Sequence, residues 1–385
     1  MRTFSLPLAA AALLVGCTGP TEPEPKPDLC GESPEGLVCT IAGTGFRGAG
    51  GDGLQALQTD LFLPTAIGFT PDGHLIIDDF NNHKIRLWED DGTLTTLAGD
   101  GIHAYAEDGV PATSSGLENP INAQMAPDWT LYIQELHGAR ILRVDPVTDI
   151  LTTYAGSAEN PGYPDYCGDG GPADEACLSE AGGMALGPDG TLYFADSGNH
   201  CIRQVSPDGI IDTVAGDGTP GFVDGPADVA RFDQPMDLAV ADGALYVVES
   251  ANSALRRIDL ATREVTTLAG TGTQGTAGDG GPGVDAQLNA PRGVGVGPDG
   301  AVYVADSGNH AIRRLDPVDG TLTTVVGQLG ASGPPGEAPF HDDGRSPEDA
   351  VLNWPNDVAV SPAGDLYLVD TMNDRIRRVI GWQER

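Results

Sequence analysis

Short runs in which small, apolar and polar residues alternate fill most of the chain, and turn residues separate them. In residues 290–327, Pro291 is followed by the run GVGV, a Pro-Asp-Gly turn, and the runs AVYVAD, AIRRLD and TLTTVVG. Alternation with a period of two over about four to eight residues is typical of half-buried strands, and clusters of Pro, Asp, Gly and Asn are typical of tight turns. The pattern predicts four short antiparallel strands in this segment.

The same unit recurs along the chain. The phrase ADSGNHCIR at 195–203 returns at 305–313 as ADSGNHAIR, with a single change. Weaker copies begin at Asp78, Gln134, Val248 and Val369. Such self-similarity is the sequence signature of propellers and solenoids. We predict six blades, at about 63–99, 119–156, 180–216, 234–270, 290–327 and 354–380.

The last unit lacks its fourth strand before the chain ends. Residues 37–43 read LVCTIAG, which matches TLTTLAG at 93–99 and EVTTLAG at 264–270. We expect this N-terminal segment to complete the last blade, which closes the ring and leaves no open sheet edge. The prediction is an all-β fold: a six-bladed β-propeller with four antiparallel strands per blade.

The repeated unit also resembles a known family. The pattern PxGVxVxPDGxVYVADSGNHxIR, followed by TVxG and joined by GTGTxGxxGDGGPxxxAxLNxP, is similar to the NHL repeat, and the match covers residues 37–380. This resemblance implies a six-bladed β-propeller. It implies no particular function, because such propellers include binding modules, lactonases and lyases.

The N-terminus is typical of an export signal. Residues 1–17 carry Arg2, then an apolar run, and end in Leu-Val-Gly-Cys, which resembles a bacterial lipobox. We expect Cys17 to be lipidated, with 18–36 as a Pro/Glu-rich tether and 37–385 as the propeller. The alternative is an ordinary cleaved signal with an incidental cysteine. Thr18 favours the outer membrane if the cell is Gram-negative, so membrane contact is expected only through the lipid.

Export would permit disulfides. The local pairs Cys30–Cys39 and Cys167–Cys177 are the expected bridges, which leaves Cys201 as a buried apolar residue in a strand. The chain contains no Cys-x-x-Cys, so we expect no zinc or redox site built from cysteine.

The formal charge of −36 argues against nucleic acid as a partner, because phosphates would be repelled. The charge is compatible with a soluble extracellular surface, or with a surface whose oxygen atoms hold Ca²⁺. Each connector between blades also carries an Asp-Gly pair, with too few nearby carboxylates to bind Ca²⁺ alone. We interpret these pairs as turns, at 52–53, 108–109, 169–170, 224–225, 279–280 and 343–344.

Two further columns of the repeat carry titratable residues. All six blades keep a carboxylate at the end of the second strand: Asp79, Glu135, Asp196, Glu249, Asp306 and Asp370. An active site needs one set of residues at one place, not six copies of the same acid around a ring. We therefore expect these acids to act as turn clamps: each carboxylate would hold a turn by accepting backbone N–H bonds or by pairing with a basic side chain. A histidine column is spread around the ring and cannot easily converge on one metal: His83, His200 and His310, with Ala139, Ser253 and Asp374 in the other blades.

The axis of the ring is the place where chemistry is expected. Two residues after the opening of the first strand, the column reads Ala66, Asn122, Gly183, Asp237, Gly293 and Asp357. Asn122, Asp237 and Asp357 belong to alternate blades, so they would point three oxygen-bearing side chains inward and could hold Ca²⁺ or another divalent cation. Arg292 and Asn356 would line the mouth of the channel. The alternatives are that these residues only solvate a wet channel, or hold a structural cation.

The resemblance to gluconolactonase and regucalcin-like propellers implies a catalytic meaning for the same three residues. There a channel metal polarises a lactone carbonyl or activates water. This chain shows neither a fourth ligand nor a general base, and it lacks the Gly-x-Ser-x-Gly and His-Glu-x-x-His motifs. We assign no catalytic residue.

The sequence favours a monomeric binding or scaffold module that is anchored in the cell envelope and presents loops to a protein or glycan. The connectors at 157–179 and 328–353 are the longest and least repetitive, so they would carry partner specificity unless they are tolerated insertions. The alternative function is a divalent-metal-dependent hydrolase of the lactonase type, with its site in the channel.

Overall fold

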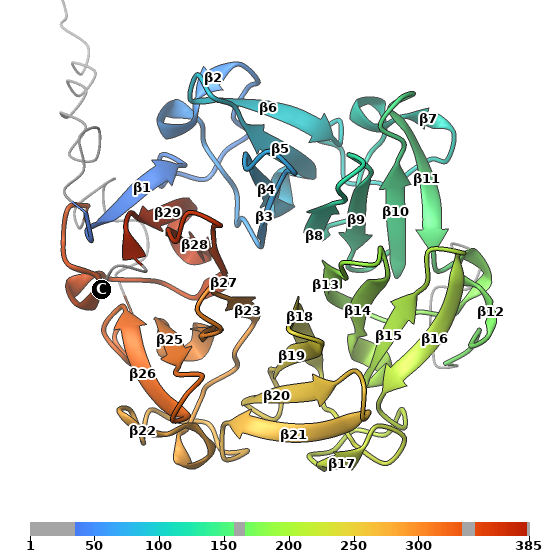
Figure 1. Cartoon of the computed structure of the whole chain (residues 1–385). Helices are drawn as coiled ribbons and strands as arrows, with labels where there is room; N and C mark the ends of the chain where they lie inside the picture. Colours follow the sequence, from blue (N-terminus) through green and yellow to red (C-terminus); the bar gives the residue numbers. More distant parts are fainter. Residues whose placement is uncertain (1–34, 158–165, 333–342, 383–385) are drawn as a thin grey trace, which may run out of the picture.

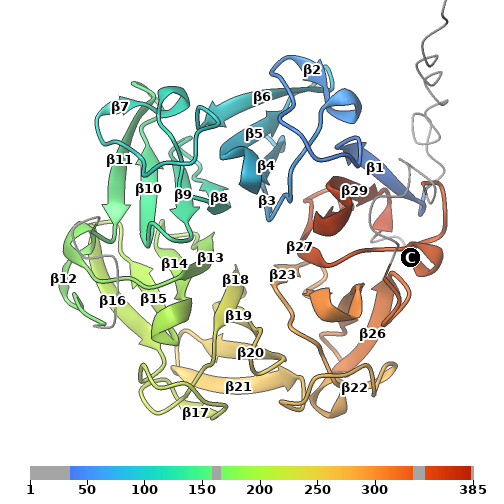
Figure 2. The same cartoon turned by 180° about the vertical axis from the view of Figure 1, so that it is seen from behind.

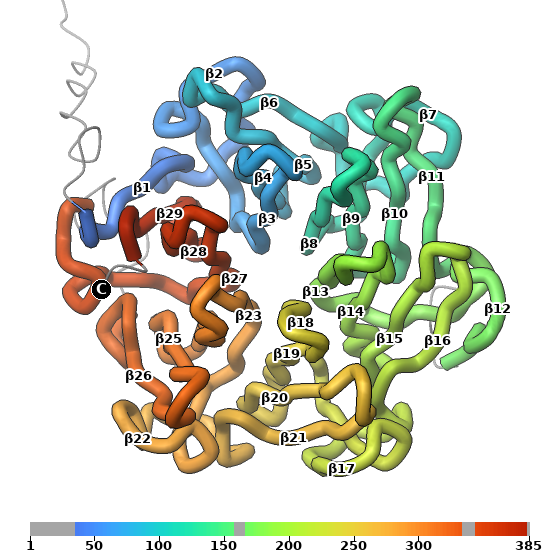
Figure 3. Tube along the Cα trace, viewed as in Figure 1, coloured from blue at the N-terminus to red at the C-terminus, as the bar shows by residue number. Residues whose placement is uncertain are grey.

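Six small antiparallel sheets surround a central axis. The computed structural model describes residues 35–157, 166–332 and 343–382. The sheets follow one another around the ring in chain order, with the first of the four strands of each repeat nearest the axis (Figures 1 and 3). The predicted all-β, six-bladed propeller is confirmed.

The strands of each blade are given from the axis outward. Blade 1 contains β3 (Ile67–Phe69), β4 (Leu75–Asp79), β5 (Lys84–Trp88), β6 (Thr93–Ala98) and β2 (Leu54–Gln55). Blade 2 contains β8 (Pro120–Met125), β9 (Leu131–Glu135), β10 (Arg140–Val144), β11 (Ile150–Ala155) and β7 (Val110–Pro111). Blade 3 contains β13 (Ala181–Leu186), β14 (Leu192–Asp196), β15 (Cys201–Val205), β16 (Ile210–Ala215) and β12 (Gly171–Pro172).

The other three blades repeat this order. Blade 4 contains β18 (Pro235–Ala241), β19 (Ala244–Glu249), β20 (Ala254–Asp259), β21 (Glu264–Ala269) and β17 (Gly225–Pro226). Blade 5 contains β23 (Gly293–Val296), β24 (Val302–Asp306), β25 (Ala311–Leu315), β26 (Thr321–Val326) and β22 (Gly281–Pro282). Blade 6 contains β27 (Pro355–Val360), β28 (Leu366–Asp370), β29 (Arg375–Val379) and β1 (Val38–Ala42).

Five blades have one more strand than the four expected. The extra strand is a two-residue piece of the connector that pairs with the outer strand, as Gly171 pairs with Ile211 in blade 3. Two residues are too few to show an alternating pattern, so the sequence carries no signal for this strand.

The last blade closes the ring as expected. β1 pairs antiparallel with β29, with Val38 opposite Val379 and Cys39 opposite Arg378. Both views of the ring show these two strands side by side (Figures 1 and 2). The two ends of the propeller therefore share one sheet, which removes the open edge that an unclosed ring would expose.

The core consists of six apolar clusters, one at each junction between neighbouring blades. The cluster between blades 1 and 2, for example, contains Ile76 and Ile85 from one blade and Ile133 and Leu142 from the other. Another cluster joins blades 6 and 1, through residues such as Tyr367 and Ile77. Burial of apolar surface between the blades thus stabilises the ring as a whole.

Single turns of 3₁₀ helix complete the described structure. Four follow a second strand: η2 (Phe80–Asn82), η5 (Ser197–Asn199), η7 (Ser307–Asn309) and η9 (Thr371–Asn373). Five lie in connectors: η1 (Ala56–Gln58), η3 (Ala112–Ser114), η4 (Ala173–Glu175), η6 (Gly283–Asp285) and η8 (Pro347–Asp349). Among the described residues, no helix has the length and apolar character needed to cross a membrane.

The cysteines agree with the expected pairing where the structure describes them. Cys167 and Cys177 form a disulfide with a Cα–Cα distance of 5.0 Å, and Cys201 is a buried free cysteine. Cys39 is disulfide-bonded, while its expected partner Cys30 lies outside the described residues, as does Cys17.

Candidate functional site

The repeated acids lie at the ends of the second strands and are fully buried. In blade 3, the Asp196 carboxylate accepts a hydrogen bond from the backbone N–H of Ser179 at 2.8 Å and from Asn199 Nδ2 at 2.9 Å. It also pairs with Arg203 at 3.3 Å. A backbone N–H bond and an arginine partner are found for all six acids: Asp79, Glu135, Asp196, Glu249, Asp306 and Asp370.

The arginines explain why the connectors repeat an Asp-Gly pair. Arg203 Nη2 lies 2.7 Å from Asp169 of the connector, so one buried guanidinium joins the second strand to the connector. The same bridge occurs in the pairs Arg86–Asp52, Arg256–Asp224, Arg313–Asp279 and Arg377–Asp343. A buried charge with two carboxylate partners is a structural element whose loss is costly.

Blade 2 departs from this arrangement in the way its decayed sequence suggests. Leu142 stands where the other blades carry the arginine. Arg140 reaches the longer Glu135 side chain instead, at 2.9 Å. Asp108 of the connector accepts a hydrogen bond from the backbone N–H of Thr153 at 2.8 Å. The clamp is thus rebuilt from different positions.

The histidine column joins neighbouring blades. His200 Nδ1 accepts a hydrogen bond from the backbone N–H of Gln234 at 3.3 Å, and His310 Nδ1 accepts one from Trp354 at 3.0 Å. Asp374 does the same for the N–H of Leu63 at 2.8 Å. Each donor residue opens the next blade. These side chains serve separate junctions and do not meet.

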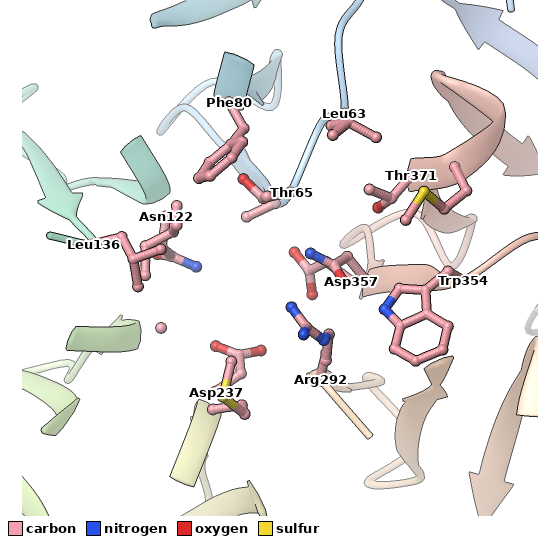
Figure 4. Close-up of a pocket in the computed structure, with 16 residues that line it drawn as sticks. Leu63, Thr65, Phe80, Asn122, Leu136, Asp237, Arg292, Trp354, Asp357 and Thr371 are labelled. Atoms are coloured by element: carbon pink, nitrogen blue, oxygen red, sulfur yellow. The ribbon is translucent and has the colours of Figure 1, made fainter. Parts of the chain in front are cut away.

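Two pockets meet on the axis. The first, which we call the mouth pocket, has a volume of about 480 Å³ and lies at the N-terminal ends of the inner strands (Figure 4). It is lined by Leu63, Thr65, Ala66, Phe80, Ile121, Asn122, Leu136, Gly183, Met236, Asp237, Arg292, Trp354, Asn356, Asp357, Thr371 and Met372. The second, of about 720 Å³, is lined by the inner strands toward their C-terminal ends.

The structure brings all five channel residues expected from the sequence to the mouth pocket. Asn122, Asp237 and Asp357 line both pockets, so they form the neck between them. Figure 4 shows these side chains pointing toward the centre of the channel, with Arg292 beside them. Asn356 lies next to Asp357 in the chain and also lines the mouth.

The two aspartates of the neck connect blades through backbone groups. Asp357 Oδ2 accepts a hydrogen bond from the N–H of Ile67 in blade 1 at 3.0 Å, and its Oδ1 accepts one from Val358 at 2.7 Å. Asp237 Oδ2 accepts one from Val294 in blade 5 at 2.9 Å. A Cβ on Gly183 would stand 1.9 Å from Asp237 Oδ1, so glycine is required there. Gly293 stands in the same relation to Asp357, so the packing explains why a glycine precedes each of the two aspartates in this column.

The neck is a poor place for negative charge. Burial raises the pKa of Asp357 to about 7. Burial, and then the nearby Asp357 carboxyl, raise the pKa of Asp237 well above its usual value. A third acid, Asp78, was missed at the level of sequence. It is fully buried, and its pKa is also raised by burial and then by Asp357. The signal for Asp78 is that it is the one charged residue in its column, which reads Gln134, Ala195, Val248, Ala305 and Val369 in the other blades.

These contacts test whether the neck suits a divalent cation. Both oxygens of Asp357 and one of Asp237 already accept backbone N–H bonds. Within the described ranges, no group of three or more His, Cys, Asp or Glu side chains is placed to hold a metal ion. The donor set fits a junction between blades better than a metal shell, and Ca²⁺ binding by Asn122, Asp237 and Asp357 stays a prediction.

Arg292 differs from the buried arginines of the clamps. Its guanidinium carbon lies 5.8 Å from the centroid of the Trp354 ring. Within the part of the chain that the structure describes, no carboxylate pairs with it. Its Nε has no hydrogen-bond partner, which is also true of clamp arginines such as Arg203 and Arg313. Burial lowers its pKa. The corresponding positions of the other blades carry no charge: Thr65, Ile121, Gly182, Met236 and Asn356.

Six blades of this repeat around a channel, with a pocket at its mouth, make the protein an NHL-repeat β-propeller. The chain belongs to the teneurin NHL domain family, whose model matches residues 36–251 and 261–372. Teneurin-1 of Gallus gallus is 27% identical over 360 residues, which cover 84% of this chain and 13% of that protein. Teneurin-m of Drosophila melanogaster is 28% identical over 353 residues, which cover 85% of this chain and 12% of that protein. This chain thus corresponds to a small part of these relatives.

Solved structures show the same fold at low sequence identity. An auxiliary nutrient binding protein from Bacteroides thetaiotaomicron aligns with a TM-score of 0.60 at 18% identity, over 89% of this chain and 75% of that one. A gluconolactonase from Xanthomonas campestris aligns with a TM-score of 0.55 at 14% identity, over 89% and 90%. These similarities concern the fold alone.

Proposed function

We propose that the protein is a lipid-anchored propeller of the cell envelope that binds a protein or a glycan and does not convert it. The observation that supports this most directly is the mouth pocket, which combines apolar walls with Arg292, an arginine without a carboxylate partner among the described residues. Concave, mostly apolar sites with a few polar groups are the usual form of binding sites.

The acids at the neck support binding over turnover. A hydrolase needs a general base or a metal-activated water in contact with the substrate. Asp357 is held by two backbone N–H groups and Asp237 by one, so neither carboxylate is placed as a freely available base. The contacts of Asp357 with Ile67 and of Asp237 with Val294 join neighbouring blades, which is a sufficient reason for the presence of these acids.

The proposed location rests on the N-terminal segment. The apolar run that ends in Cys17 is expected to direct export and lipidation, and the tether that follows would hold the propeller away from the membrane. The disulfide between Cys167 and Cys177 is compatible with an oxidising compartment.

The test is a binding assay with chemical analysis of the ligand. The purified protein is applied to a glycan array and to a panel of envelope and extracellular proteins, and hits are measured by interferometry. Each ligand is then recovered and examined by mass spectrometry. We expect saturable binding with the ligand unchanged. A chemically altered ligand, or no saturable binding across both panels, would contradict the proposal.

The alternative is a metal-dependent hydrolase of the lactonase type, and the convergence of Asn122, Asp237 and Asp357 at the neck is the observation in its favour. Calorimetric titration of Ca²⁺, beside an Asp237→Ala/Asp357→Ala variant, decides it. Binding of one ion that the variant loses, together with metal-dependent turnover of a lactone, would establish this alternative.

A further inference from the structure

We propose that the mouth pocket binds a small organic carboxylate with an apolar or aromatic body, and that Arg292 receives the acid group. This inference rests on the part of the proposed function that makes the mouth pocket a binding site, and it goes beyond the protein or glycan partner by naming a small-molecule ligand for that pocket. It follows from the charge balance, rigidity, electrostatics and size of the pocket.

The charge balance of the pocket is unlike that of the rest of the ring. The buried arginines of the clamps each pair with carboxylates, as Arg313 does with Asp306 at 3.1 Å and with Asp279 at 3.0 Å. Arg292 contacts the Trp354 ring, and no described carboxylate lies within ion-pair distance of it. A partly buried guanidinium presents a planar fork of N–H donors that matches a carboxylate in a bidentate pair.

The arginine lies against a wall that is held in place. The backbone N–H of Trp354 donates to His310 Nδ1 at 3.0 Å, and the two rings meet edge to face at 6.1 Å between centroids. Trp354 has a left-handed φ of 53°. All six blades use a positive φ at this position, so the conformation is architectural. The side chains differ, and only Trp354 and Leu63 of this column line the mouth.

The remaining walls suit the body of such a ligand. Phe80, Leu136 and Met236 line the pocket around its axis, and the volume of about 480 Å³ falls in the range typical of small-molecule sites. Figure 4 shows Phe80 and Leu136 across the opening from Arg292 and Trp354. An acid held at Arg292 would direct its apolar part toward this wall.

The two acids of the neck do not cancel this preference. Both oxygens of Asp357 and Oδ2 of Asp237 accept hydrogen bonds from backbone N–H groups. These donors partly balance the negative charge of the two carboxylates at the neck. The formal charge of −36 makes the surface as a whole unattractive to anions, so anion binding requires a local cation such as Arg292.

The experiment compares two probes of the same shape in three proteins. The probes are 2-naphthoate and its uncharged analogue 2-naphthamide, and binding is measured by calorimetry at pH 6.5. The proteins are the wild type, Arg292→Gln, and Arg143→Gln, which removes an exposed arginine of β10 outside the pocket. Naphthamide binding and the thermal midpoint show whether each variant is folded.

We expect naphthoate to bind with one-to-one stoichiometry and more tightly than naphthamide. Arg292→Gln should weaken naphthoate binding by about 10- to 100-fold, because a hydrogen-bonded charged pair is lost. Naphthamide binding should change by less than about 3-fold, and Arg143→Gln should match the wild type. This pattern assigns the acid group to Arg292.

Two results would overturn the inference while leaving the proposed function standing. One is equal affinity of the wild type for both probes, or an unchanged naphthoate affinity in Arg292→Gln, which would show that charge does not select the ligand. The other is the absence of binding by either probe together with a positive result on the glycan or protein panel. No binding in either experiment would contradict both proposals.

Discussion

Removing the charge of one repeated acid tests the clamp directly. Asp306 is fully buried and accepts hydrogen bonds from the N–H of Asn289 at 2.7 Å and from Asn309 Nδ2 at 2.8 Å, beside its pair with Arg313 at 3.1 Å. In Asp306→Asn, one oxygen remains for three donors, and the new NH₂ group must face at least one of them. A buried donor is then left unsatisfied.

The expected loss of unfolding free energy is about 2–3 kcal/mol. Breaking a buried ion pair by removing one partner costs about 3–5 kcal/mol. Arg313 keeps its second partner, Asp279, at 3.0 Å, so the cost of the isosteric change should lie below that range. Asp306→Ala, which removes every acceptor, should reach about 3–5 kcal/mol.

The matched control is Asp299→Asn in the same blade. Asp299 pairs with Arg314 at 3.0 Å, but its side chain is 37% exposed. Exposed pairs contribute about 0–1 kcal/mol, so the control should lose less than about 1 kcal/mol. Stabilities are measured by urea denaturation at pH 7, with the slope of the transition checked for constancy. If Asp306→Asn and Asp299→Asn are equally stable, the buried acids do not clamp the blades.

Three other perturbations have defined outcomes. Burial raises the pKa of Asp357 in the folded protein to about 7, above the unfolded value of about 3.8. Between these values the native protein binds a proton that the unfolded chain does not, so wild-type stability falls as pH rises through this window. Asp357→Asn should therefore be more stable relative to the wild type at pH 8 than at pH 5. Thermal midpoints from pH 5 to 8 measure this. Cys167→Ser/Cys177→Ser should lower the unfolding free energy by about 2–3 kcal/mol, since the bridge closes a loop with a sequence separation of 10, and denaturation without reductant measures it. Cys17→Ala should move the protein from the detergent phase to the aqueous phase in Triton X-114 partitioning of cells.

Each of these outcomes has a contrary result. A stability difference between Asp357→Asn and the wild type that does not vary with pH would show that Asp357 is ionised normally. A cysteine variant as stable as the wild type would show that the disulfide does not restrict the unfolded chain. A Cys17→Ala protein that still enters the detergent phase would contradict lipidation at this residue.

The repeat made much of the fold predictable. Because each blade repeats the same sequence pattern, the weak copy of the repeat that begins at Gln134 could be recognised from the strong copies that begin at Ala195 and Ala305. Alignment of the copies also placed Asn122, Asp237 and Asp357 in one column. A column in a ring converges on its axis, which is why these residues meet at the neck. Asp78 was open to the same argument, as the one acid in its column.

The amino-acid sequence by itself determined the ring, its six blades and its closure by residues 37–43, since periodicity and the missing strand are local properties of the chain. Only the tertiary structure decided which charges are paired. Arg313 and Asp279 are 34 positions apart and meet because a connector returns to its own blade. Arg292 has the same chemistry, yet no described acid comes within pairing distance of it. Pairing depends on distances across the fold, and those distances make the clamps structural and the mouth pocket a candidate binding site.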